Sequence, residues 1–152
     1  MTARLPPVLL IVLVAAAAGC RVPMPGVVPG TVCDADAVAA DIGWWESAPP
    51  LEAMNRVTQA LRLKVEHSEK IDALRGAIDG GDDRCRKVFY DGCTATHEKV
   101  SAAGAALEQL KAGRPRDQAY DPELAKLSFA TYCTAAWDFG AFAATVEECL
   151  GR

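Results

Sequence analysis

The residues of this chain best suited to chemistry are its six cysteines, spread over 152 residues. They are Cys20, Cys33, Cys85, Cys93, Cys133 and Cys149. No two of them form C-x-x-C, the motif of thioredoxin-like redox sites and zinc ribbons, and no C-x-x-C-H haem motif occurs. We therefore expect the cysteines to form structural disulfides, and we predict no cofactor and no metal ion.

The two histidines are the other candidates for metal binding. Folding the first long helix back on the second would bring His67 near the level of His97, with Cys93 one turn away. A zinc site needs further ligands at firm spacing, and none is present. We therefore expect His67 and His97 to face solvent on charged helix faces.

The paired carboxylates, such as Glu147 and Glu148, are neighbours along a helix. General acid–base catalysis needs two groups that face a shared cleft, so these pairs indicate solvated helix ends. Neither G-x-S-x-G nor H-E-x-x-H occurs. The sequence therefore predicts a protein that is not an enzyme.

The N-terminus has the features of an export signal. Arg4 is followed by an apolar run from Val8 to Ala18 and then by small residues. The run is about eleven residues long, whereas a helix that spans a bilayer needs roughly 20. We therefore expect a signal peptide and not a membrane-spanning helix.

The signal ends with Ala17, Ala18, Gly19 and Cys20. This stretch resembles the lipobox of bacterial lipoproteins, in which the cysteine bears a thioether-linked diacylglycerol and cleavage occurs just before it. The resemblance implies that residues 1–19 are a signal peptide and that Cys20 is the lipidation site. It also implies a periplasm-facing protein of the cell envelope, bound to the membrane through its N-terminal lipid. In a Gram-negative cell, Arg21 rather than aspartate after the cysteine implies the outer membrane.

A plain secretory signal is the alternative, because the same alanines offer an A-x-A-type cleavage site. Cys20 would then be available for a disulfide. Lipidation of Cys20 instead leaves five cysteines, so one must be free or pair with another molecule. In both cases export places the thiols in an oxidising compartment.

Residues 20–32 are predicted to be a tether that leads to one domain over residues 33–152. The segment from Arg21 to Val32 contains three prolines and two glycines and has no usable period. Removing residues 1–19 removes only Arg4 among the charged residues, so the net charge changes from −4 to −5. This acidity argues against a nucleic-acid partner.

The domain begins with a predicted short helix that Asp34 or Asp36 could cap and that ends before Pro49. We expect Trp45 to pack in the core and Trp44 to cover its rim. A long helix follows, from Leu51 to the Asp79–Gly81 turn. Its apolar positions are Leu51, Met54, Val57, Leu61, Val65, Ile71, Leu74 and Ile78.

Two further long helices are predicted. One starts at Asp82 and Asp83 and ends before Gly113. Gly92 inside this helix costs about 1 kcal/mol of helix stability relative to alanine, so either close packing offsets the cost or the helix kinks there. The other starts with Asp121 as its N-cap and runs to the C-terminus, with a break at Gly140 left open. The predicted fold is therefore all-α, an antiparallel bundle of three long helices plus one short N-terminal helix, stapled by disulfides.

The antiparallel order predicts nested bridges, Cys85–Cys149 and Cys93–Cys133. The eight residues from Cys85 to Cys93 oppose sixteen from Cys133 to Cys149, so a turn at 137–140 would have to absorb the excess. Local pairing within each helix is the alternative, but eight helical residues span about 12 Å and a disulfide needs Cα atoms within roughly 7 Å. Cys33 is left over if Cys20 bears the lipid.

These features favour a non-enzymatic binding, scaffold or inhibitor module with a possible protein partner in the envelope. The alternatives are a secreted, lipid-free disulfide protein, a small-ligand carrier, or an enzyme with an unrecognised helical site. A cavity lined by polar groups would favour a carrier or an enzyme. A solid core with one bare apolar patch would favour a protein partner.

Overall fold

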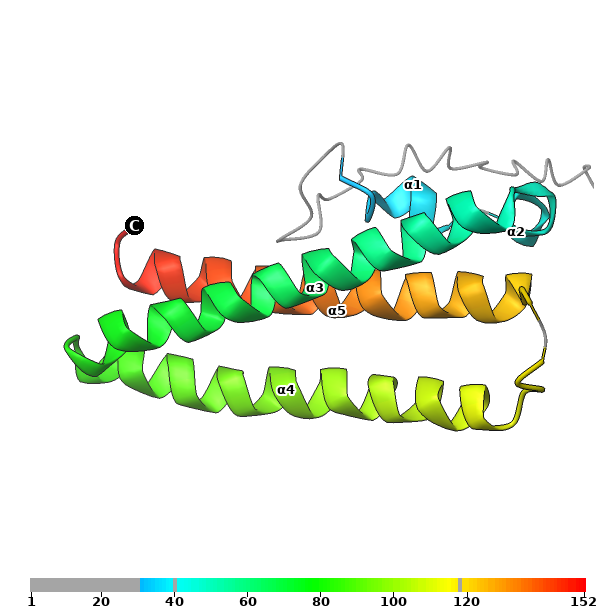
Figure 1. The fold of residues 1–152 in the computed structure, drawn as a ribbon. Helices are drawn as coiled ribbons and strands as arrows, with labels where there is room; N and C mark the ends of the chain where they lie inside the picture. The colour runs from blue at the N-terminus through cyan, green and yellow to red at the C-terminus, as the bar shows by residue number, and fades with distance from the viewer. Residues whose placement is uncertain (1–30, 40, 118) are drawn as a thin grey trace, which may run out of the picture.

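The computed structural model describes residues 31–39, 41–117 and 119–152, and it confirms an all-helical bundle (Figure 1). The predicted signal peptide, the lipidation site Cys20 and most of the tether lie outside these residues. The helices in chain order are α1 (Ala35–Val38), α2 (Ile42–Ser47), α3 (Pro50–Asp79), α4 (Asp83–Ala112) and α5 (Pro122–Cys149). No helix in the described part of the chain has both the length and the apolar character that crossing a membrane requires.

The N-terminal region forms two short helices where the sequence predicted one. Asp41 has an extended backbone, and its side chain accepts a hydrogen bond from the Ile42 amide at 2.7 Å, so it caps a new helix. Trp45 is fully buried against Phe129, and Trp44 packs edge-on against it with the ring centroids 4.8 Å apart. The predicted roles of the two tryptophans are therefore confirmed.

Aspartates begin both later helices, as the sequence predicted. The side chain of Asp82 accepts a hydrogen bond from the Arg84 amide at 2.7 Å, and that of Asp121 accepts one from the Leu124 amide at 3.0 Å. These contacts satisfy amides that the first turn of a helix leaves without backbone partners.

Helix α5 is continuous, so the turn predicted at 137–140 and the possible break at Gly140 are both wrong. The segment is held on several sides at once. Phe139 and Phe142 are buried in the core, and the indole nitrogen of Trp137 donates a hydrogen bond to the Cys33 carbonyl at 2.8 Å. Unwinding the helix here would expose these rings and break this contact.

The Cys85–Cys149 bridge is confirmed, but the predicted Cys93–Cys133 bridge is wrong. Cys133 is bonded to Cys33, and Cys93 is a free, partly exposed thiol. The continuity of α5 explains the difference. Sixteen residues of unbroken helix rise about 24 Å and eight rise about 12 Å, so Cys93 cannot lie opposite Cys133 once Cys85 lies opposite Cys149.

Gly92 lies where α4 packs tightly against Phe142 of α5. An ideal Cβ atom built on Gly92 would be 2.5 Å from Cε2 of Phe142, whose ring is itself buried against Phe89. Close packing therefore offsets the low helix propensity of this glycine, and α4 runs through it without interruption.

Gly92→Ala should lower the free energy of unfolding by about 1–2 kcal/mol, because the added methyl group displaces a buried ring and this outweighs the gain in helix propensity. Gly104→Ala is the matched control on the same helix, since nothing lies within 4 Å of its added Cβ. It should raise the free energy of unfolding by about 0.5–1 kcal/mol. Urea denaturation measures both, and equal stabilisation by the two variants would contradict the close approach of Phe142.

Candidate functional site

A pocket of about 350 Å³ opens between α3, α4 and α5, at the end of the bundle where α3 begins and α4 ends. We call it the end pocket. Figure 1 shows α3 and α4 together at their connecting turn and apart at this end. The lining residues used below are Met54, Leu61, Lys111, Arg114, Ser128 and Tyr132.

One wall of the end pocket belongs to an apolar stripe of α3 that the other described helices leave exposed. Leu51, Met54, Leu61 and Val65 recur on one side of the helix, and Leu51 is the most exposed at 75%. Further along α3, Ile71 and Ile78 are fully buried. The stripe is exposed because α3 and α4 diverge at this end of the bundle. The residues of the stripe nevertheless belong to the apolar pattern from which the sequence predicted the α3 helix.

Lys111 of α4 and Tyr132 of α5 form a polar part of the wall. The Lys111 ammonium donates to Glu108 at 2.8 Å and to the Tyr132 hydroxyl at 3.2 Å. Burial lowers the pKa of Lys111, but the hydrogen bonds to Glu108 and Tyr132 outweigh it, so this pKa is raised. The Lys111 side chain is therefore protonated and positively charged near neutral pH.

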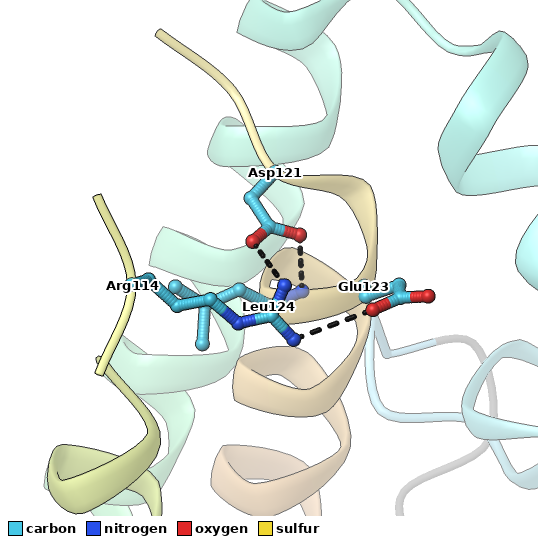
Figure 2. Close-up of polar contacts among 4 residues, drawn as sticks. All are labelled: Arg114, Asp121, Glu123 and Leu124. Carbon is cyan, nitrogen blue, oxygen red and sulfur yellow. Dashed lines mark hydrogen bonds and ion pairs between the residues drawn. The ribbon is translucent and has the colours of Figure 1, made fainter. Parts of the chain in front are cut away.

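Arg114 ties the loop after α4 to the start of α5, as Figure 2 shows. Its guanidinium contacts Asp121 at 2.8 Å and the more exposed Glu123 at 3.3 Å. The second carboxylate oxygen of Asp121 accepts the hydrogen bond from the Leu124 amide. One partly buried carboxylate thus caps α5 and fixes the rim of the end pocket.

Tyr120 fixes the same rim to the N-terminal region. Its hydroxyl donates to the Trp45 carbonyl of α2 at 2.8 Å. Burial, with a smaller contribution from the charge of Asp121, raises the pKa of Tyr120, so the hydroxyl stays protonated and keeps this hydrogen bond near neutral pH.

Ser128 is a buried polar residue of the end pocket, with 5% of its surface exposed. Within the described part of the chain, its hydroxyl makes no hydrogen bond. Two polar side-chain atoms of the described residues, Thr31 Oγ1 and Trp45 Nε1, are completely buried without a hydrogen-bond partner, and the Ser128 hydroxyl is not one of them. The hydroxyl therefore meets the pocket space and is free to bond to whatever enters.

Each of the two histidines bonds to a backbone carbonyl. His67 Nδ1 donates to the Ala136 carbonyl at 2.7 Å, and His97 Nδ1 donates to the Cys93 carbonyl at 2.9 Å. Both side chains are partly buried, so the prediction that they face solvent is wrong. Among the described residues, no group of three or more histidine, cysteine, aspartate or glutamate side chains could hold a metal ion.

The predicted site residues and the end pocket occupy different places. Cys85–Cys149 is near the turn between α3 and α4, Cys33–Cys133 joins the N-terminal region to α5, and neither bridge lines the end pocket. The sequence analysis missed the pocket. The available signal was Ser128, a polar residue four positions from both Leu124 and Tyr132 and therefore on the same helix face as these two.

Comparison of the chain with models of protein families, with characterised proteins and with solved structures finds no match. The function therefore has to follow from the geometry of the molecule itself.

Asp121→Ala should lower the free energy of unfolding by about 1–2 kcal/mol, because it removes the cap of α5 together with the partner of Arg114. Asp121→Asn keeps an oxygen for the cap and should cost less than half as much. Glu123→Gln, which alters only the exposed partner, is the control and should change the stability by less than about 0.5 kcal/mol. Urea denaturation measures the free energy of unfolding of the three variants. If Asp121→Asn lowers it as much as Asp121→Ala does, the ion pair with Arg114, and not the helix cap, is the important contact.

Proposed function

We propose that this protein is an exported, lipid-anchored binding module of the bacterial cell envelope, which acts without catalysis through its end pocket. The observation that carries the binding role is the end pocket itself, a cavity beside an uncovered apolar stripe. Exposed apolar surface next to a concave site is typical of regions that bind a ligand or a partner.

The two disulfides support the proposed location outside the cytoplasm. Two disulfides indicate an oxidising, extracytoplasmic compartment. They use Cys33, Cys85, Cys133 and Cys149, so Cys20 is not needed for either bridge and is available for lipid. This agrees with the lipobox resemblance and with a tether that lets the domain extend from a membrane anchor.

The charged groups at the end pocket favour binding over proton transfer. Asp121 is held by Arg114 and by the Leu124 amide, and Lys111 is held by Glu108 and Tyr132. A general base needs a free lone pair near neutral pH, and the raised pKa of Lys111 removes that option. These groups are suited to holding a bound molecule in place.

A secreted, lipid-free protein is the second candidate, and the free thiol of Cys93 is the observation that favours it. Cys93 is partly exposed, so a third bridge from Cys93 to Cys20 would satisfy all six cysteines in an oxidising compartment.

Photo-crosslinking in intact cells tests the binding role. A photo-reactive amino acid at position Leu61, which lines the end pocket, should give an adduct of discrete mass on the purified protein. The matched control is position Gln59, which is exposed two residues away on the same helix and does not line the pocket. Adducts of equal yield and mass at both positions, or none at either, would contradict a binding role for this pocket.

A further inference from the structure

We propose that the end pocket binds a small amphipathic carboxylate, a molecule with one medium-length apolar chain and one anionic head. This inference rests on the proposed binding function and names the ligand class of the same site. It follows from the size of the pocket, from its apolar wall and from three residues with hydrogen-bond donors that line it.

The size and depth of the pocket favour a small molecule over a protein surface. Its volume of about 350 Å³ is within the usual range for small-molecule sites. Only 5% of the surface of the Ser128 residue is exposed, so a flat or convex partner would have little access to it. A slender chain with a polar end could enter and satisfy it.

The polar wall offers donors. The Ser128 hydroxyl has no partner among the described residues, and Tyr132 lies one helical turn further along the same face of α5. The Tyr132 oxygen already accepts from Lys111, so its own proton is free to be donated. Ser128, Tyr132 and Lys111 all line the end pocket, so two hydroxyl protons and one ammonium group are available there for an anionic acceptor.

The neighbouring carboxylates do not cancel this preference. Glu108 pairs with Lys111 from a position where 69% of its side chain is exposed, and such pairs are weak. Asp121 is turned toward Arg114 and the Leu124 amide. A ligand carboxylate that reaches Lys111 from inside the pocket would be less hydrated than Glu108, and its contact with Lys111 would be correspondingly stronger.

The apolar wall fits the chain of such a ligand. Met54 and Leu61 are 46% and 38% exposed, and both line the pocket together with the buried Val57. The hydroxyl of Thr58, on the same wall, donates to the Met54 carbonyl at 2.9 Å and so does not compete for the ligand. A chain lying along this wall would cover apolar surface that the fold leaves exposed to water.

Isothermal calorimetry on the oxidised full chain bearing Cys20→Ser, in low salt and without detergent, tests the inference. Decanoate should bind at one site per chain. Lys111→Met should weaken the affinity at least tenfold, and Ser128→Ala should weaken it about tenfold, the usual effect of losing a hydrogen bond to a charged group. Because the Ser128 hydroxyl has no partner among the described residues, Ser128→Ala should leave the thermal midpoint unchanged or slightly raised.

Lys99→Met is the matched control, since Lys99 is also a lysine of α4 in an ion pair, with Asp138, but does not line the end pocket. It should leave the affinity unchanged. Equal binding of decyltrimethylammonium, or equal weakening by all three variants, would overturn the inference. If decanoate does not bind while the adduct at position Leu61 persists, the ligand class is wrong and the binding function stands; if both fail, the proposed function is wrong as well.

Discussion

Helix α5 buries one broad face of side chains, and the other four described helices all pack against it. Its buried residues include Phe129, Phe139 and Phe142, which would each expose a large apolar ring if α5 were bare. Both disulfides end on this helix, at Cys133 and Cys149, and they close loops of 100 and 64 residues. Loops of this length correspond to roughly 4–5 kcal/mol of stabilisation per bridge when chain entropy dominates.

The end pocket is a consequence of this arrangement. Helices α3 and α4 both pack on α5, so they are free to diverge from each other away from their connecting turn (Figure 1). Among the described helices, the divergence leaves the apolar stripe of Leu51, Met54, Leu61 and Val65 exposed, and Ser128 lines the pocket beside it. The contacts of Asp121 with Arg114 and of Tyr120 with Trp45 fix the loop that forms the rim.

The parts of the fold that the sequence predicted are those set by local rules. Asp82 and Asp121 cap their helices because a short carboxylate can reach the free amides of the first turn, and this needs no knowledge of the tertiary structure. The pairing of Cys133 was missed because it depends on whether α5 is continuous at Gly140, which long-range packing decides. The end pocket was missed for a related reason. An apolar period shows that a helix has a core face, but it does not show where a neighbouring helix stops covering that face.

The most direct test of this account is a disulfide map of the protein recovered from its own cells, alkylated without reductant and digested before mass spectrometry. The account predicts two cross-linked peptide pairs, Cys33 with Cys133 and Cys85 with Cys149, together with alkylated Cys93. It also predicts an N-terminal peptide that starts at Cys20 and bears the mass of a diacylglycerol. A peptide joining Cys93 to Cys133 would contradict the continuous α5 on which the structure depends, and a disulfide at Cys20 would contradict the lipid anchor.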